Sequence, residues 1–569
     1  MTILSPSLRS RYILAAVAGL LLTAAYPKIG IAGFAWLAPG LMIAAALGKR
    51  AGEVFRIGYI AGLSHYLSLL YWLLLIPYRW CGIPLGPIAG WLALSGFLAL
   101  YPAVWVWLVT PRPDRPNSMD RAPSAEPERA GASLLFEGPG GVLARNWVRR
   151  TVWALFGAAA WVCFEMVLAR FLGGFPWALL GVSQYALVPL LQVASVTGVY
   201  GVSFVVAWVS LALLSAGLLV IRRPTFRSLW VAELFLPLIV VALLFNYGFR
   251  ILRGEPARPR SVRVTLVQPS IPQTVIWNPT NDVATFQELL RLTEQALTNK
   301  TDILVWPESA IPKPLRYDTN ILNAVGALAK RHQVWMIVGS DDIEPSRTSS
   351  DPEAGDYFNS SFLIAPDGEL AGRYTKRSLV IFGEYIPLEH WLPFMKFFTP
   401  SQGSFVAGTR PAEFDLRGLD VKISVLICFE DVFPQLGRSD VKPDTDFVVN
   451  ITNDGWFDEG AAQWQQAVTA LFRAVENRVP LVRCCNNGLT CWIDAQGRIR
   501  QYLRDDRGTS YGPGFLNFEL PVMERGAVHS LTFYTRHGDW FGWSCAGIAG
   551  LMLMLKLAGR RKARAEKQT

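Results

Sequence analysis

The residues of this sequence best suited to catalysis are an acid, a lysine and a cysteine, each placed just after an apolar run. DILVW (302–306) leads through Pro307 into Glu308, GRYT leads into Lys376, and KISVLI leads into Cys428. A carboxylate can take the proton of a thiol, and the thiolate can attack a carbonyl carbon to form an acyl-enzyme. An ammonium nearby can stabilise the oxyanion of the tetrahedral intermediate. These residue types indicate acyl transfer, provided that the fold brings them together.

Each of the three residues also has an ordinary structural explanation. A cysteine that ends a buried strand is most often a small core hydrophobe. Glu308 could be a surface acid, and Lys376 a solvated lysine. The combination favours chemistry, because predicted strands and helices separate the three residues and each still follows the end of a different strand.

The elements that must position these residues lie between 255 and 530, where strand-like and helical patterns alternate. This alternation predicts a layered α/β fold. Near-continuous apolar strands predict sheets that are buried on both faces. A hairpin is expected to turn at Asp367-Gly368. The expected strands are 262–268, 302–306, 334–340, 422–428 and 446–452, and the expected helices are 285–298, 323–332 and 463–478.

The rest of the chain has the composition of a membrane protein. Hydrophobic residues make up 51% and charged residues only 17%, whereas soluble proteins carry about 25% charged residues. The apolar excess lies before residue 250, in a predicted multi-span membrane domain (1–250), and in a C-terminal transmembrane helix (541–558) followed by a basic cytoplasmic tail (559–569). A cleaved signal peptide at 9–27 is the competing interpretation of the first span, and the spans that follow at once disfavour it. We expect membrane spans near 12–27, 31–47, 56–77, 86–109, 151–171, 195–220, 228–248 and 541–558.

The basic residues of the short loops predict the orientation. They fall on one side of the membrane when the spans alternate, so both termini are expected in the cytoplasm and the catalytic domain outside it. The Pro-, Ala- and charge-rich stretch 111–146 is expected to be a flexible cytoplasmic loop. The net charge of +10 is explained by these loops, so no nucleic-acid partner is expected.

Seven cysteines are present, and their spacing is not that of a metal site. No metal or other cofactor is expected. Cys484 or Cys485 could form a disulfide with Cys491 in an oxidising exterior, although nothing in the spacing requires it.

Several motifs together resemble a known family. WPESAIP (306–312), YTKRSLVIFGEYIPLE (374–389) and LICFED (426–431) resemble the nitrilase superfamily, whose catalytic residues are Glu, Lys and Cys in that order. Other motifs, together with the predicted membrane layout, are similar to the apolipoprotein N-acyltransferase family within it. These are QPSIPQTVIWNP (268–279), ITNDGWF (451–457), RAVENRVPLVR (473–483), NNGL (486–489) and LTFYTRHGDWFG (531–542).

The resemblance implies a nitrilase-like αββα sandwich outside the membrane and a role for each matched residue. Cys428 would be the nucleophile, Glu308 its base and Lys376 the oxyanion stabiliser. Glu384 and Glu430 match supporting acids. The alternative for Glu384, which we consider weaker, is a buried structural acid paired with Lys376, and that pairing could itself orient the lysine. Residues implied near the substrate are Trp277, Tyr385 and Trp456.

This sequence departs from the family pattern at three positions near the site. Phe429 stands where a tyrosine is common, and Gln466 and Leu471 align with a histidine and an arginine. The Glu-Lys-Cys set is intact.

The resemblance implies a bacterial inner-membrane enzyme that acts on lipid-anchored substrates. A phospholipid would donate an acyl chain to Cys428 as a thioester, and the α-amino group of a lipoprotein's N-terminal S-diacylglyceryl-cysteine would accept it. One alternative is a membrane-tethered nitrilase or amidase that hydrolyses C–N bonds. Another is an inactive nitrilase-like scaffold, which the intact set of three residues disfavours.

The charge bias of the loops gives a test of orientation. A reporter that is active only in the cytoplasm should be silent when fused after residue 258, because the catalytic domain is expected outside. The same reporter fused at the C-terminus is the control and should be active. Activity at residue 258 would reverse the assignment.

Overall fold

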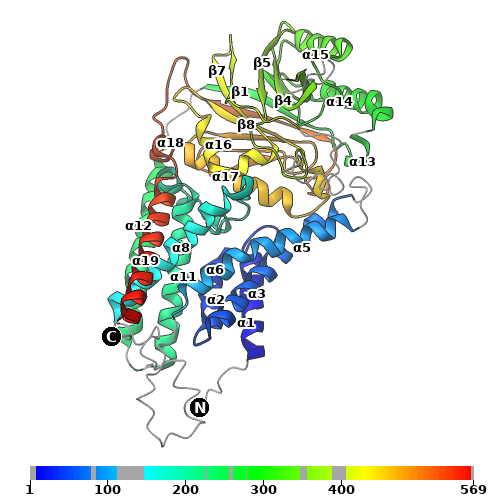
Figure 1. Cartoon of the computed structure of the whole chain (residues 1–569). Helices are drawn as coiled ribbons and strands as arrows, with labels where there is room; N and C mark the ends of the chain where they lie inside the picture. The colour runs from blue at the N-terminus through cyan, green and yellow to red at the C-terminus, as the bar shows by residue number, and fades with distance from the viewer. Residues whose placement is uncertain are drawn as a thin grey trace, which may run out of the picture. The chain divides into compact units, whose positions relative to one another are not determined.

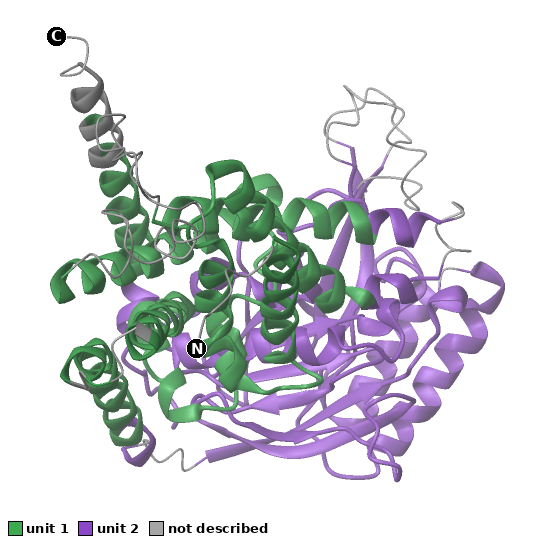
Figure 2. Ribbon diagram, turned by 90° about the horizontal axis from the view of Figure 1, so that it is seen from below, with its two compact units in different colours: residues 1–71, 91–250, 539–569 green, residues 72–90, 251–538 purple. Residues whose placement is uncertain are grey.

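The computed structural model describes residues 8–77, 85–111, 146–222, 225, 227–254, 260–276, 278–346, 355–386 and 405–565. The chain divides into two compact units, coloured separately in Figure 2. Unit 1 comprises Met1–Tyr71, Trp91–Arg250 and Asp539–Thr569, and unit 2 comprises Trp72–Gly90 and Ile251–Gly538.

Unit 1 is helical throughout its described residues. Its longer helices, labelled in Figure 1, are α1 (Leu8–Ala24), α2 (Ala38–Ala46), α3 (Ala51–Leu69), α6 (Leu100–Val109), α8 (Trp147–Leu168), α11 (Val199–Arg222), α12 (Arg227–Arg253) and α19 (Trp540–Ala565), with α5 (Gly86–Leu98) beginning in unit 2. Short helical segments join them: η1 (Ala32–Trp36), η4 (Phe171–Gly173), η5 (Leu180–Gln184), α9 (Val188–Leu191) and α10 (Ala194–Thr197).

Small residues let these helices pack closely, as is common where helices associate in lipid. A Cβ atom on Gly62 of α3 would lie 2.9 Å from the Cα atom of Ala99, at the start of α6. Two of the charged groups inside unit 1 are paired: Arg150 and Glu233 are buried and their side chains meet at 2.8 Å. Close packing and internal pairing are what an apolar surrounding requires.

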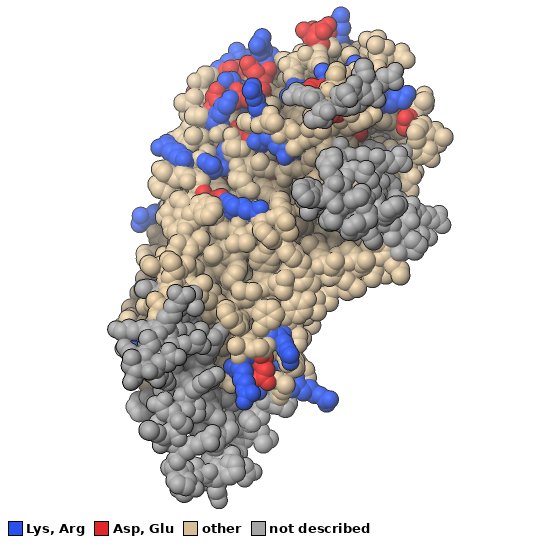
Figure 3. Space-filling model, viewed as in Figure 1, with Lys and Arg blue, Asp and Glu red and all other residues tan. Residues whose placement is uncertain are grey.

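Four helical segments are long and apolar enough to cross a bilayer: Gly86–Val109, Trp147–Leu168, Val199–Ile221 and Ser228–Arg253. They coincide with four of the expected spans. On the face drawn in Figure 3, much of the surface over unit 1 carries neither acidic nor basic side chains. The total of eight spans stays a prediction. The interior of the expected loop 111–146 lies outside the described residues, and α19 continues to Ala565.

Unit 2 contains two six-stranded sheets. The first has the order β12-β1-β2-β3-β4-β5 and the second β11-β10-β9-β8-β7-β6. Strands β1, β2 and β3 run parallel, as do β7, β8 and β9. The strands are β1 (Arg260–Gln268), β2 (Ile303–Val305), β3 (Trp335–Pro345), β4 (Gly355–Ile364), β5 (Leu370–Thr375), β6 (Glu413–Leu416), β7 (Val421–Ile427), β8 (Phe447–Thr452), β9 (Leu481–Cys485), β10 (Cys491–Ile493), β11 (Ile499–Tyr502) and β12 (Gly514–Val522).

The two sheets lie face to face between two layers of helices. The Cys484 thiol of β9 donates to the carbonyl oxygens of Val267 and Val305, at the ends of β1 and β2. Helices α14 and α15 lie beside the first sheet, and α16 and α17 beside the second (Figure 1). The predicted αββα sandwich is therefore confirmed. Its helical segments are α13 (Gln273–Ile276), η6 (Pro279–Asn281), α14 (Asp282–Ala296), α15 (Thr319–His332), η8 (Cys428–Val432), α16 (Pro434–Ser439), η9 (Asp454–Phe457), α17 (Ala462–Asn477) and α18 (Phe533–His537), and η2 (Tyr71–Leu75) lies at the boundary of the units.

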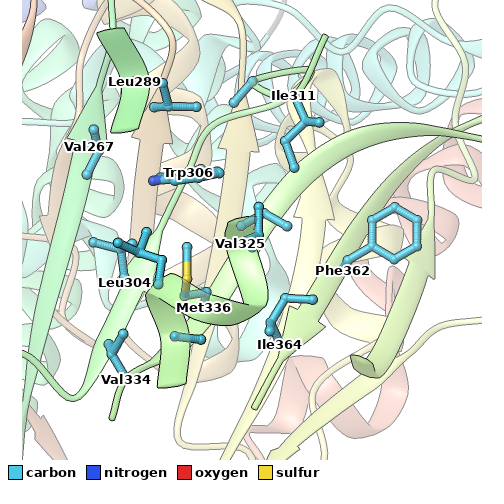
Figure 4. Close-up of a cluster of buried hydrophobic side chains, with 14 of the residues drawn as sticks. Val267, Leu289, Leu304, Trp306, Ile311, Val325, Val334, Met336, Phe362 and Ile364 are labelled. Atoms are coloured by element: carbon cyan, nitrogen blue, oxygen red, sulfur yellow. The ribbon is translucent and has the colours of Figure 1, made fainter. Parts of the chain in front are cut away.

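An apolar cluster fixes the first sheet against its helices. Leu304 and Trp306 meet Met336 of β3 and Val325 of α15, and all four side chains are fully buried (Figure 4). The Trp306 indole N–H donates to the Thr293 hydroxyl of α14 at 3.0 Å. This packing anchors the segment directly before Glu308.

Candidate active site

Close backbone contacts determine where Glu308 lies. Strand β2 ends at Val305, and Trp306 still donates its N–H to the Ile337 carbonyl of β3. The chain then passes against Gly339, where a Cβ atom would lie only 2.2 Å from the Pro307 oxygen. Only glycine at 339 leaves room for this approach. Glu308 is consequently held beside the sheet, with 5% of its surface exposed.

Lys376 follows β5 and joins two acids. Its ammonium lies 3.1 Å from Glu308 Oε1 and 2.8 Å from Glu384 Oε1. The lysine is 1% exposed, so it is not the solvated side chain that its type alone would suggest. The structure thus brings Glu308 and Lys376 together, and Glu384 is the pairing acid that the sequence allowed.

Asn359 of β4 provides a second bridge between the same carboxylates. Its side-chain amide donates to Glu308 Oε1 at 2.8 Å and to Glu384 Oε1 at 2.9 Å. Its backbone carbonyl accepts from the Lys376 N–H at 2.9 Å. One residue therefore orients both the acids and the lysine.

The pKa values of this cluster depend on burial and on the paired charges. Burial alone would lower the pKa of Lys376, but the carboxylates of Glu308 and Glu384 outweigh it and raise that pKa well above the usual range. Burial raises the pKa of the Cys428 thiol, and the charge of Glu308 adds to this, whereas Lys376 and a hydrogen bond from Thr452 oppose it. The lysine is therefore a permanent cation, and the resting cysteine is a thiol.

The backbone at Cys428 turns sharply. Its φ of 54° lies in the left-handed region, which costs energy for a residue with a side chain. Two amides hold this peptide: Asn450 donates to the Cys428 carbonyl oxygen at 3.0 Å and Gln466 donates to it at 3.2 Å. The turn ends β7 and places the thiol where the charges of Glu308 and Lys376 reach it.

Glu430 connects the end of β5, directly before Lys376, to the end of β7, directly before Cys428. Its Oε1 accepts from the backbone N–H groups of Arg377 and Ser378 at 2.7 and 3.0 Å. Its Oε2 accepts from the Tyr374 hydroxyl and from the Ile427 N–H, both at 2.8 Å. With four donors the buried carboxylate is fully satisfied. Its contacts are those of a residue that holds the site together.

A buried arginine contacts residues next to the turn at Cys428. Arg483 of β9 contacts Asp431 and lies 2.6 Å from Asp454, and all three side chains are almost completely inaccessible. Gln466 donates to Asp431 at 3.0 Å as well as to Cys428. Gln466 thus supports the turn at Cys428, at a position where the family pattern has a histidine.

The structure describes two of the three residues expected near the substrate. Trp277 lies outside the described residues. Tyr385 is half-buried in the loop that carries Glu384, and Trp456 is half-buried in η9. The next residue, Phe457, packs edge-on against Trp72 with ring centroids 4.5 Å apart. The Trp72 indole N–H donates to Gln465 at 3.1 Å.

The remaining cysteines of the described residues are free thiols. Cys484, Cys485 and Cys491 are buried in β9 and β10, so the disulfide that their positions allowed is not formed. Within the described ranges, no three His, Cys, Asp or Glu side chains are grouped as metal ligands.

Comparison with known proteins gives matches along nearly the whole chain. Residues 18–212 match the model of the apolipoprotein N-acyltransferase N-terminal domain, and residues 263–512 match that of carbon-nitrogen hydrolase. An apolipoprotein N-acyltransferase of Geobacter metallireducens is 34% identical over 98% of this chain and 96% of its own length. The chain belongs to the apolipoprotein N-acyltransferase family.

A second relative agrees with this membership. The Methylococcus capsulatus apolipoprotein N-acyltransferase is 29% identical over 95% of each chain. Among solved structures, Saccharomyces cerevisiae Nit3, described as a member of branch 10 of the nitrilase superfamily, is 19% identical, with a TM-score of 0.34 over 46% of this chain and 90% of that one. The family models and the two relatives confirm the resemblance inferred from the motifs.

Sequence reasoning missed the polar residues that support the site. Asn359, Asn450 and Arg483 lie within strands whose neighbouring residues are buried. A polar side chain inside such an apolar run must find a buried partner. That signal was present in the sequence, but it does not identify the partner.

The four donors on Glu430 predict a strong effect of a small change. Glu430→Gln turns an amide NH2 toward N–H donors, which leaves buried groups unpaired and costs about 1–3 kcal/mol. The midpoint of thermal unfolding in detergent should fall. Glu519→Gln, on the exposed side of β12, is the matched control and should leave it unchanged. Equal midpoints for the two variants would contradict the bridging role.

Proposed function

We propose that this chain transfers an acyl group from a phospholipid to the α-amino group of an N-terminal S-diacylglyceryl-cysteine of lipoproteins. Cys428 is the nucleophile, Glu308 the base and Lys376 the oxyanion stabiliser. The observation that carries the proposal is the buried Lys376 ammonium, which lies between Glu308 and Glu384 and close enough to Cys428 to shift its pKa.

In the first half-reaction, Glu308 takes the proton of the Cys428 thiol as its sulfur attacks the ester carbonyl. The carbonyl oxygen becomes negative, and Lys376 stabilises it. When the C–O bond breaks, the lysophospholipid oxygen takes the proton from Glu308. The products are a thioester on Cys428 and a lysophospholipid.

In the second half-reaction, the α-amino group attacks the thioester carbonyl and Glu308 accepts its proton. The C–S bond then breaks, the sulfur regains the proton, and an amide is released. A thioester stays reactive toward an amine, whereas an amide does not readily return its acyl group. Burial of Glu308 and Lys376 supports transfer over hydrolysis, because it limits water at the reacting carbon.

The lipid substrates agree with the apolar parts of the chain. Trp72 belongs to the expected span 56–77 and, within unit 2, packs against Phe457 next to Trp456. This contact supports a site loop that lies near lipid. The proposed location is the bacterial inner membrane, with the catalytic domain 255–530 on the periplasmic side and both termini in the cytoplasm.

A membrane-tethered amidase would use the same three residues, so the acceptor distinguishes it from the proposed transferase. The helical segments long enough to span a bilayer favour the transferase, since a hydrolase of small C–N compounds has no need of them. An inactive scaffold would not need a buried cation between two acids, which is costly to desolvate.

The nucleophile is tested with phospholipid alone. Wild-type protein incubated with phospholipid should gain the mass of one acyl chain, and Cys428→Ala should gain none, by intact-protein mass spectrometry. Cys428→Ser should be nearly inactive, because a hydroxyl is a weaker nucleophile. Cys491→Ala, which removes a buried thiol of β10, is the control and should keep the adduct. An acyl adduct on Cys428→Ala would show that Cys428 is a buried core thiol and not the nucleophile.

Lys376 should act in both half-reactions, because each places negative charge on the same carbonyl oxygen. Lys376→Met keeps a similar volume without the charge, and loss of one oxyanion donor costs about 10²–10³ in rate. Single-turnover measurements should show slower acylation by phospholipid and slower transfer from preformed acyl-enzyme. If either step ran at the wild-type rate, the lysine would only orient the carboxylates.

A further inference from the structure

The orientation of the Asn359 amide is fixed by its partners. Its Nδ2 faces Glu308 Oε1 and Glu384 Oε1, and ionised carboxylates only accept hydrogen bonds. Its Oδ1 must therefore point away from them. That oxygen is buried and finds no donor among the described residues, which is costly unless a proton is supplied.

Asp341 lies directly opposite Asn359 on the neighbouring strand. The two residues are partners in the antiparallel ladder of β3 and β4, so their side chains share one face with Cβ atoms about 5 Å apart. The adjacent Asp342 points to the other face, where it pairs with Arg316 and Arg373. In the described part of the chain, Asp341 Oδ1 also is buried without a partner.

Two unpaired acceptors on one face cannot bond to each other unless one carries a proton. Asp341 is the residue able to carry it. The charged groups that act on Asp341 are Glu308, Glu384 and Lys376 across the site and Asp342 beside it. An ionised Asp341 would add a third carboxylate around a single ammonium. Burial, together with the charges of Glu308 and Glu384, raises the pKa of Asp341 to about 7.

We propose that Asp341 is a positioning residue that works as a neutral acid, donating its O–H to Asn359 Oδ1 and so keeping the Asn359 amide between Glu308 and Glu384. The proposal rests on the proposed function of Glu308. Ionisation of Asp341 removes the donor and adds a negative charge beside the base. The acylation rate of the wild-type protein should therefore contain a falling limb above neutral pH that depends on Asp341.

Asp341→Asn is the decisive variant, because its amide donates at every pH and never ionises. The rate of Cys428 acylation by phospholipid is measured in single turnovers of the full-length protein between pH 6 and 9. The ratio of the Asp341→Asn rate to the wild-type rate should be near one at pH 6 and rise to about 10 at pH 8, as expected for a group half ionised near pH 7. A ratio that stays constant with pH would overturn the proposal.

Asp341→Leu separates the donor from simple packing. Leucine branches at Cγ as aspartate does but has no O–H, so this variant should acylate more slowly than Asp341→Asn by roughly tenfold at every pH. Equal rates for Asp341→Leu and Asp341→Asn would contradict the donor role.

Thermal unfolding gives a readout that does not need catalysis. The pKa of Asp341 in the folded protein, about 7, lies above the ordinary value of 3.8. Between these two values the unfolded chain is ionised at Asp341 while the folded protein keeps the proton, so the wild-type fold loses stability progressively as pH rises. The thermal unfolding midpoint of Asp341→Asn should exceed that of wild type by an amount that increases from pH 5 to pH 7 and then stays constant. If wild type forms no acyl-enzyme but this gap appears, the proposed function fails while the protonation of Asp341 stands. Absence of the gap contradicts the protonation itself.

Discussion

The ammonium of Lys376 is the charge on which the rest of the site depends. Glu308 and Glu384 present their Oε1 atoms to the same cation, at 3.1 and 2.8 Å. Without it, two carboxylates would face each other away from water with no opposite charge between them, which is costly. The ammonium supplies that charge, and its own pKa stays well above the usual range because both acids outweigh the effect of burial.

The fold holds this cation, its two acids and the thiol at fixed positions relative to one another. Three strands end at the site, and each is tied to its neighbours by polar groups: Gly339 admits the segment before Glu308, Asn359 fixes both acids, and Glu430 joins β5 to β7. The thiol is neutral at rest, since burial raises its pKa. In the proposed mechanism it becomes a nucleophile only as Glu308 takes its proton. A permanently ionised thiolate would be costly at this buried position. A thiol that loses its proton only during the reaction avoids that cost at a site that takes an apolar substrate.

The strands and the three reactive residues were predictable because periodicity and residue type are local properties. GRYT and KISVLI end where β5 and β7 end, directly before Lys376 and Cys428. DILVW ends one residue beyond β2, and Pro307 separates it from Glu308. The partners were not predictable. Asn359 contacts Glu308 from 51 positions away and Arg483 contacts Asp431 from 52, and such pairings depend on which strands become neighbours.

In the proposed reaction, the acyl group on Cys428 is transferred to an amine and not to water. The most direct measurement starts from isolated acyl-enzyme carrying a labelled acyl chain, mixed with a peptide that begins with S-diacylglyceryl-cysteine. The account predicts that the label moves to the α-amino group of the peptide and stays on Cys428 when the peptide is omitted. Release of labelled fatty acid at the same rate with and without the peptide would contradict it, and would identify the protein as a hydrolase.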